Sequence, residues 1–220
     1  MSTLQAHELY RFFHIGDDET AALRGVSLSV APGEIVVVTG PSGSGKSTLL
    51  SCITGLDEPD GGSVDVAGIR LSRRSEAERA RIRASNFGIV LQAGNLFAHL
   101  TAEQNIRFQM QLAGTLDEQR LAYLIDSVEL SHRSSALPTE LSGGEVARAS
   151  LAVALATNPP ILVADEPTAE VDQGTESRLI AHFEAQRKAN RATLLATHSE
   201  VLARKADRII RLSDGRIADG

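Results

Sequence analysis

The sequence predicts an α/β protein in which helices and strands stack in three layers around a mostly parallel sheet. Four short apolar runs, at residues 35–39, 87–91, 161–164 and 193–197, are separated mostly by helical patterns. Their apolar character is continuous rather than alternating, which is typical of parallel strands buried on both faces. Strands of this kind that alternate with helices indicate a three-layer α/β core.

Length and composition are those of an ordinary globular protein. The chain has 220 residues, of which 42% are hydrophobic, so it can bury a core as one large domain. A net charge of −6 argues against nucleic acid as a partner. No apolar run approaches the roughly 20 residues that cross a bilayer, and residues 1–8 lack the layout of a secretory signal, so no direct membrane insertion is expected. The single cysteine, Cys52, fits a reducing cytosol and a buried position.

Two segments outside the apolar runs predict further strands. Residues 26–30 alternate between apolar and polar and end at a Pro-Gly turn signal, and residues 61–68 form a short strand pattern between glycines. We therefore expect an antiparallel β subdomain beside the parallel core. The arginine-rich segment 70–83 is interleaved with Glu76 and Glu78, which predicts a solvated helix rather than a cationic surface for lipid or nucleic acid.

The middle of the chain predicts a helical subdomain. Residues 95–157 have mostly helical patterns, and Thr101 with Gln104 forms the pattern of a capping box at the start of one helix. The expected organisation is a single domain over residues 1–220, with the core in 1–94 and 158–220.

A glycine-rich stretch joins the first apolar run to a helical pattern. Residues 40–47 match the phosphate-binding pattern G-x-x-x-x-G-K-S. Glycines let backbone N–H groups approach a phosphate, and the following helix adds the positive end of its dipole. We expect Lys46 to bridge the β- and γ-phosphates and the Ser47 hydroxyl to hold Mg²⁺. The alternative, a glycine-rich turn with a chance lysine, does not explain the flanking strand and helix. The nucleotide-binding residues expected here are Gly40, Pro41, Ser42, Gly43, Ser44, Gly45, Lys46, Ser47 and Thr48.

Two adjacent carboxylates follow the apolar run at residues 161–164. Ligands of open α/β sheets lie just beyond the carboxyl ends of the strands. Asp165 is therefore expected to bind Mg²⁺ beside Ser47, and Glu166 to accept a proton from the attacking water. An ordinary strand end with solvated acids is the alternative, and the phosphate-binding stretch argues against it.

A second glycine pair precedes an alanine-rich helical pattern. In residues 141–145, Ser142 is a good N-cap, and the glycines that follow leave backbone N–H groups bare at a helix start. This predicts a second anion-binding helix terminus in the same chain, although a capped helix alone would also explain it.

Together these motifs resemble the nucleotide-binding ATPase subunit of an ABC transporter, which has a P-loop NTPase core. Residues 40–47 match the Walker A motif, 141–145 the family signature and 161–166 the Walker B motif. Three more matches follow the family's order: Gln92 (Q-loop), residues 169–172 (D-loop) and His198 (switch histidine). The resemblance spans nearly the whole chain and implies ATP and Mg²⁺ as cofactors.

The resemblance implies roles for residues outside the phosphate-binding stretch. Phe13 matches the aromatic that stacks on adenine, with Tyr10 and Phe12 as rivals for this position. Gln92 would touch Mg²⁺ or the attacking water, and His198 would contact the γ-phosphate and hold the geometry of the catalytic carboxylate and water.

Members of this family work as head-to-tail pairs, so Ser142 and Gly144 of one copy would complete the phosphate site of the other, with Asp172 at the interface. The implied partners are a second ATPase subunit, in a homo- or heterodimer, and two transmembrane permease subunits that dock near Gln92. The implied location is cytoplasmic, peripheral on the inner face of the cell membrane. Glu170 departs from the small residue usual in the D-loop, which leaves pairing with a different subunit open.

Within the family, the strings at residues 40–47, 141–145 and 164–169 resemble most the lipoprotein-release and macrolide-export branch with FtsX-like permeases. The favoured function is an ATPase that energises such an exporter. One alternative is a soluble ABC-type ATPase, which usually carries two cassettes or a long insertion. The other is a slow-turnover nucleotide-gated clamp, which would lack Glu166.

The signature helix departs from the family pattern. Most relatives carry Arg-Gln-Arg where Val146, Ala147 and Arg148 stand, and a later arginine is replaced by Val153. We expect this loss of positive charge near the phosphate end to weaken ATP-dependent closure or slow turnover.

Overall fold

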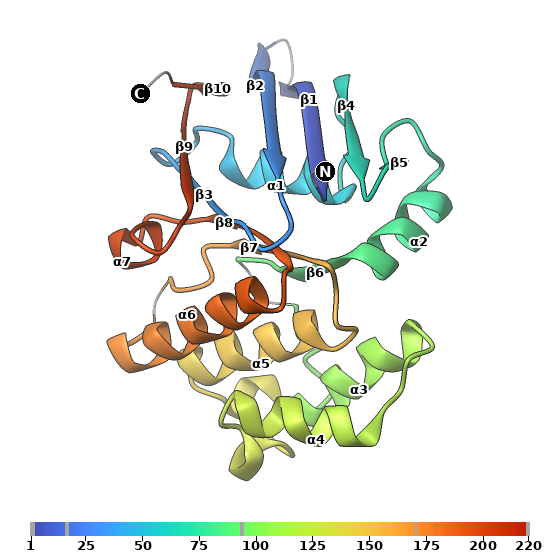
Figure 1. Cartoon of the computed structure of the whole chain (residues 1–220), viewed down its shortest axis with the longest axis vertical. Coiled ribbons are helices and arrows are strands. Elements are labelled where there is room, and N and C mark those ends of the chain that lie inside the picture. The colour runs from blue at the N-terminus through green and yellow to red at the C-terminus, as the bar shows by residue number, and fades with distance from the viewer. Residues whose placement is uncertain (1–2, 16–17, 93–94, 170, 219–220) are drawn as a thin grey trace.

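The computed structural model describes residues 3–15, 18–92, 95–169 and 171–218. A six-stranded sheet lies at the centre of the molecule, with a four-stranded antiparallel sheet on one side and a group of helices on the other (Figure 1). Helix α1 (Lys46–Thr54) lies between the two sheets. The predicted α/β class with an antiparallel β patch is confirmed.

The six-stranded sheet contains every predicted parallel strand. All neighbours in it are parallel except the pair at its β10 edge. In spatial order its strands are β10 (Arg216–Ile217), β9 (Arg208–Ser213), β3 (Ile35–Thr39), β8 (Ala192–Ala196), β7 (Ile161–Asp165) and β6 (Phe87–Val90).

The antiparallel sheet is built around a long hairpin. Residues 26–30, predicted as strand, belong to it, and of the predicted segment 61–68 residues 61–66 form a strand of it. In spatial order its strands are β2 (Asp18–Val30), β1 (Leu4–Ile15), β4 (Gly61–Val66) and β5 (Ile69–Arg70).

Three helices fall within the segment predicted as helical, and the capping box at Thr101 and Gln104 is confirmed. Helices α5 and α6 pack against the central sheet, while α3 and α4 pack on α5 from outside. The helices of this side are α3 (Ala102–Leu112), α4 (Glu118–Ser127), α5 (Gly143–Leu155) and α6 (Gln173–Lys188), with short 3₁₀ turns at Ser131–Arg133 and Pro138–Glu140. The short helix α7 (Glu200–Ala203) follows β8.

Strand β3 shows why the central strands are apolar throughout. Ile35 and Val37 point into the core shared with α3–α6, whereas Val36 and Val38 point into the core shared with α1 and the antiparallel sheet. Both faces of the strand are buried from Ile35 to Val38, which explains why these four positions are apolar.

The arginine-rich segment forms a helix that starts later than the sequence pattern suggested. Helix α2 (Glu76–Asn86) begins after a capping box of Ser75 and Glu78, and Arg70 belongs to β5 instead. None of its residues is fully buried, as expected of a solvated helix. Among the described residues, no helix is both long and apolar enough to cross a membrane.

Candidate nucleotide-binding and catalytic site

The glycine-rich loop connects β3 to α1, as its sequence predicted. Gly40 and Gly45 have φ angles of 152° and 101°. A Cβ on Gly40 would come within 2.0 Å of the Leu212 carbonyl oxygen, and one on Gly45 within 2.4 Å of the Ala22 carbonyl oxygen. Only glycine fits at either position, because a larger residue would collide with backbone. Gly45 is also the N-cap of α1, which leaves the first N–H groups of that helix open.

Lys46 is buried and lies across the inside of the loop. Its ammonium donates to the carbonyl oxygens of Gly40 at 2.9 Å and Pro41 at 3.2 Å, and lies 3.2 Å from Nε2 of His198. An ammonium can only donate, so Nε2 of His198 accepts in this arrangement. The predicted lysine and the predicted histidine, 152 residues apart in sequence, are therefore neighbours.

The two carboxylates after β7 have different environments. Asp165 is 8% exposed, and its buried Oδ1 has no hydrogen-bond partner in the part of the chain that the structure describes. Glu166 has a φ of 48°, and its N–H donates to the Ala196 carbonyl oxygen at 2.8 Å. Oε2 of Glu166 accepts the backbone N–H of His198 at 3.2 Å, and Oε1 lies 3.4 Å from Nε2 of the same histidine. The backbone of His198 thus holds one oxygen of Glu166 across the ends of two adjacent strands, while Oε1 has no hydrogen-bond partner among the described residues.

These residues line one open cavity of about 500 Å³. It joins the loop after β3, the strand ends of β7 and β8, and Gln92 after β6. The sequence did not predict Thr168, Thr197 and Ser199, which also line it; they follow the predicted carboxylates and flank the predicted histidine. The predicted residues gathered here are Ser42, Gly43, Lys46, Ser47, Gln92, Asp165, Glu166 and His198.

The signature residues lie at the exposed start of α5, where Gly143 lines a neighbouring hollow that shares Gln92 and Glu166 with this cavity. Ser142 caps the helix: its Oγ accepts the Glu145 N–H at 3.3 Å, and Oε2 of Glu145 accepts the Ser142 N–H at 2.8 Å. Accepting that backbone N–H lowers the pKa of the Glu145 carboxyl. Neither Ser142 nor Gly144 lines the cavity of its own chain.

The D-loop aspartate is joined to the signature helix through Thr175, which sequence reasoning missed. Asp172 caps α6 by accepting the Thr175 N–H at 3.0 Å and the Thr175 hydroxyl at 2.7 Å, and these bonds lower its pKa. Arg148 of α5 donates to the same hydroxyl at 3.3 Å. A Cβ on Gly144 would lie 3.0 Å from that hydroxyl, so the two helices are in close contact there. The Asp-x-x-Thr spacing, which is typical of a helix N-cap, could have predicted the contact between Asp172 and Thr175 from the sequence.

Phe13 lies on β1, outside the cavity, and is 39% exposed. The ring of its rival Tyr10 lies over Gly61, and the Tyr10 hydroxyl lies against Gly25. Phe12 is half-buried. These contacts favour Phe13 among the three aromatics, and its role stays a prediction.

The assumed location of Val153 near the phosphate end of α5 is wrong, and the expected effect on closure or turnover stays a prediction. Val153 lies in the last turn of α5, 7% exposed within the helical core, far along the helix from Ser142. Val146 and Ala147, in contrast, line a hollow of about 320 Å³ together with Gln92 and others. Glu170 of the D-loop lies outside the described residues.

Cys52 is buried in α1, as predicted. It is 1% exposed, and burial raises the pKa of its thiol to about 12, so the thiolate does not form near neutral pH.

Comparison with known proteins agrees with this geometry. A family model described as ABC transporter matches residues 23–169. The chain is 39% identical to the lipoprotein-releasing system ATP-binding protein LolD of Novosphingobium aromaticivorans, over 96% of each chain. It is 38% identical to the protein of the same name from Acinetobacter baylyi, over 98% of this chain and 97% of the relative.

A solved structure gives the same result for the fold. A dimeric ATP-binding cassette in a post-hydrolysis state, bound to ADP and Pi, superimposes with a TM-score of 0.94 and 32% identity, covering 98% of this chain and 97% of that one. Three findings agree: the loop has positions where only glycine fits, a carboxylate lies beside a histidine at the strand ends, and the matches to known proteins are long. The chain therefore belongs to the ABC transporter family, as one of its ATP-hydrolysing cassettes.

Proposed function

We propose that this chain energises a membrane complex that extracts or exports lipoproteins, by binding ATP between two head-to-tail copies and hydrolysing it. The observation that carries the proposal is the cavity in which Lys46, Asp165, Glu166 and His198 converge. The relatives named for lipoprotein release support the cargo class.

Nucleotide binding is assigned to the loop and the aromatic residue on β1. The N–H groups of the loop and of the start of α1 would surround the phosphates, and Lys46 would exchange the Gly40 and Pro41 carbonyl oxygens for phosphate oxygens. Phe13 would stack on the base. The loop residues in this assignment are Gly40, Pro41, Ser42, Gly43, Ser44, Gly45, Lys46, Ser47 and Thr48.

The residues present fit Mg²⁺. Asp165 has a buried oxygen without a hydrogen-bond partner, and Ser47 and Gln92 line the same cavity. The described part of the chain has no group of three or more His, Cys, Asp or Glu residues that could hold a metal by themselves. One carboxylate, a hydroxyl and phosphate oxygens are a usual ligand set for Mg²⁺, which would neutralise charge on the phosphates when bound.

Hydrolysis is assigned to Glu166 and His198. Glu166 would accept the proton of the attacking water, since its side chain is only 12% exposed and already fixed by the His198 N–H. Once Lys46 turns to phosphate, Nε2 of His198 no longer accepts from it, and in the tautomer that carries its proton on Nε2 the ring would donate to Glu166 or to a phosphate oxygen. The histidine would thus hold the carboxylate and the water in line with the phosphate.

The second copy is assigned to the exposed start of α5. Ser142 and Gly144 do not reach the cavity of their own chain, whereas their bare helix terminus suits the phosphate of another copy. The similar cassette in a solved structure is a dimer. Asp172, tied to this helix through Thr175, would lie at the interface.

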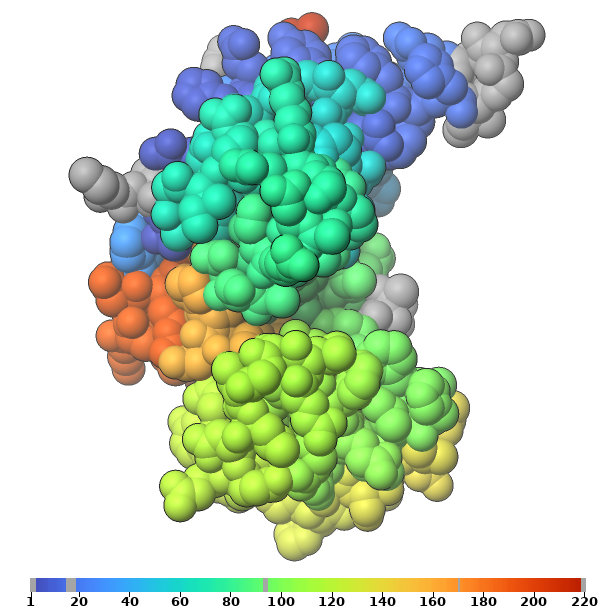
Figure 2. Space-filling view, turned by 90° about the vertical axis from the view of Figure 1, so that its right-hand side faces the viewer, coloured from blue at the N-terminus to red at the C-terminus, as the bar shows by residue number. Residues whose placement is uncertain are grey.

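The permease is assigned to a groove between α2 and α3, of about 340 Å³ (Figure 2). The groove lies beside the segment that carries Gln92, which links it to the cavity. Phe97 and Leu112 line it and are 49% and 67% exposed. Such apolar side chains at the edge of a hollow suit a protein partner, which here would be the cytoplasmic surface of the permease at the inner face of the membrane.

Replacing Glu166 by Gln tests the catalytic assignment. The amide keeps the size of the side chain but cannot accept the water's proton, so ATP turnover should fall by about 100-fold or more while Mg-ATP affinity stays within about twofold. Steady-state ATPase assays and calorimetry measure the two quantities. Full turnover in this variant would remove Glu166 from its role.

Replacing Leu112 by Asp tests the docking site. A charge in the groove should reduce co-purification with co-expressed permease subunits from detergent extract, without lowering the ATPase rate of the isolated chain. Tyr123→Asp is the matched control, because Tyr123 is 66% exposed on α4 and does not line the groove. Equal co-purification of the Leu112 variant and the wild type would contradict the assignment.

A further inference from the structure

The guanidinium of Arg11 lies against the ring of Phe13. The guanidinium carbon is 4.8 Å from the centroid of the ring, within the range at which a cation is attracted to an aromatic face. Phe13 is nevertheless 39% exposed. One face of the ring is therefore covered by a cation from the same strand, and the residue still has surface that another planar group can reach.

Two aspartates hold this guanidinium in place. Nε and Nη2 of Arg11 donate to the two oxygens of Asp57 at 2.8 and 3.0 Å, and Nη1 donates to both oxygens of Asp60 at 3.2 Å. Such two-point contacts fix the plane of the guanidinium as well as its position. The Phe12 N–H also donates to Asp60, at 2.7 Å, so Asp60 holds the backbone directly before Phe13.

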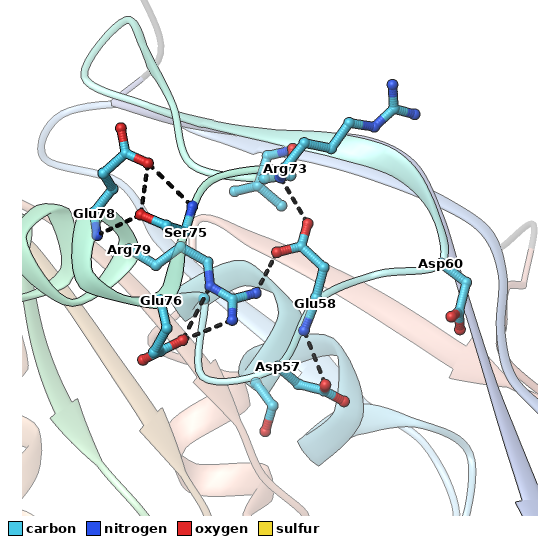
Figure 3. A network of polar contacts seen from close by, with 12 residues as sticks. Asp57, Glu58, Asp60, Arg73, Ser75, Glu76, Glu78 and Arg79 are labelled. Atoms are coloured by element: carbon cyan, nitrogen blue, oxygen red, sulfur yellow. Dashed lines mark hydrogen bonds and ion pairs between the residues drawn. The ribbon is translucent and has the colours of Figure 1, made fainter.

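The segment that carries both aspartates is anchored independently of the ring. The Asp57 N–H donates to the Ser51 carbonyl oxygen at 3.1 Å, which ties the segment to α1. Glu58 accepts the Arg73 N–H at 2.7 Å and pairs with Arg79 of α2 (Figure 3). The segment is therefore tied to α1 and α2 by bonds that do not involve Arg11.

The hairpin that carries Phe13 packs against the phosphate-binding loop. Phe13 is opposite Thr20 in the β1–β2 pair. Two residues further along β2, the Ala22 carbonyl oxygen lies so close to Gly45 that a Cβ there would be 2.4 Å away. The ring thus belongs to the part of the hairpin that continues directly into the contact with the loop.

We propose that Arg11 is a positioning residue for the nucleotide base. Held by Asp57 and Asp60, it fixes the Phe13 ring and covers one face, so that the other face receives adenine. Arg11 acts through the ring and does not contact the nucleotide. A ring that is already fixed loses less conformational freedom when a base stacks on it. The inference rests on the proposed role of Phe13 as the adenine platform.

Binding of ATP and of tripolyphosphate, which has no base, tests the proposal by calorimetry with Mg²⁺. Arg11→Gln should weaken ATP binding by about 3- to 10-fold, which is the size of a partly exposed cation–π contact. Tripolyphosphate affinity should not change. Arg11→Lys keeps a cation and should recover part of the loss. Arg70→Gln is the matched control: Arg70 pairs with Asp65 at 2.7 Å on the same sheet, and its loss should change neither affinity.

A double-mutant cycle separates a positioning role from a merely structural one. In a Phe13→Leu background, Arg11→Gln should cause no further loss of ATP affinity. The same loss in that background, an equal loss for tripolyphosphate, or an unchanged ATP affinity would each overturn the proposal. If Arg11→Gln does not fold, Asp60→Asn replaces it, because this change keeps the size of the side chain. It should cause a smaller loss of ATP affinity and leave tripolyphosphate affinity unchanged.

The same binding data also test the proposed role of Phe13 and the proposed nucleotide binding separately from the role of Arg11. If Phe13→Leu alone leaves ATP affinity unchanged, Phe13 does not stack on adenine, and the proposed role of Arg11 is wrong as well. If the wild-type chain binds neither ligand, the proposed nucleotide-driven function itself is wrong.

Discussion

At the scale of single residues, Glu166 is held in a conformation that glutamate rarely adopts. A left-handed backbone costs a non-glycine residue about 1–2 kcal/mol, and here the N–H of Glu166 is bonded to Ala196 while its carboxylate meets His198. Strain of this kind persists where neighbouring structure fixes it, often at reactive positions. One oxygen of the carboxylate is therefore already held by the His198 N–H before any ligand arrives.

His182 provides a residue-scale prediction about pH. It lies 3.0 Å from the Ser127 carbonyl oxygen, which accepts from Nε2–H, and burial lowers its pKa below the usual value of about 6.5. The unfolded chain therefore binds a proton more readily than the folded one just below this pH. Stability from His182 is complete above about pH 6.5 and declines as the pH falls toward the lowered pKa.

Urea unfolding between pH 7 and pH 5 checks this prediction. The free energy of unfolding should fall more steeply with decreasing pH in the wild type than in His182→Gln, which has no titrating group there. Identical slopes for the two proteins would contradict it.

At the scale of elements, α5 and α6 are joined through the buried hydroxyl of Thr175. Thr175→Val keeps the shape but leaves Asp172 and Arg148 each short of a partner, so the free energy of unfolding should fall by about 1–3 kcal/mol. Thr193→Val is the matched control, since the buried Thr193 hydroxyl has no hydrogen-bond partner among the described residues and its loss should be nearly neutral. Chemical denaturation measures the free energy of unfolding of both variants. An equal decrease in the two would show that the hydroxyl of Thr175 contributes nothing specific.

The sequence predicted the elements that depend on local pattern. The buried strands around Val36 and Val163 were found because they are apolar on both faces, and the caps at Thr101 and Ser142 because their spacing is local. The start of α2 was placed too early, since charge pattern alone did not show that the capping box at Ser75 begins the helix.

Site residues within motifs were predictable, and those defined by tertiary contact were not. Lys46 and His198 were expected near the same phosphate because each belongs to a motif of known order, and they lie 3.2 Å apart. The contacts of Arg11 with Asp57 and of Thr175 with Arg148 join different parts of the fold and leave no periodic trace. The burial of Val153 was missed for the same reason.

At the scale of the whole molecule, one chain carries two helix starts that suit an anion, at Gly45 of α1 and at Ser142 of α5. Ser142 and Gly144 at the start of α5 do not line the cavity beside Lys46, although Gly143 between them shares a hollow with Gln92 and Glu166. In the function proposed above, the two helix starts form one site when a second copy packs head to tail. The central claim is therefore that the ATP site is shared between copies.

ATP retention by mixed variants tests this claim most directly. In a Glu166→Gln background, which prevents turnover, Lys46→Ala disables the loop and Ser142→Arg blocks the signature helix. Neither double variant alone should retain Mg-ATP after rapid desalting. Their mixture should retain it, because pairing combines the intact loop of one chain with the intact signature of the other. A mixture that retains no ATP, or a Ser142→Arg variant that retains it unaided, would contradict the account.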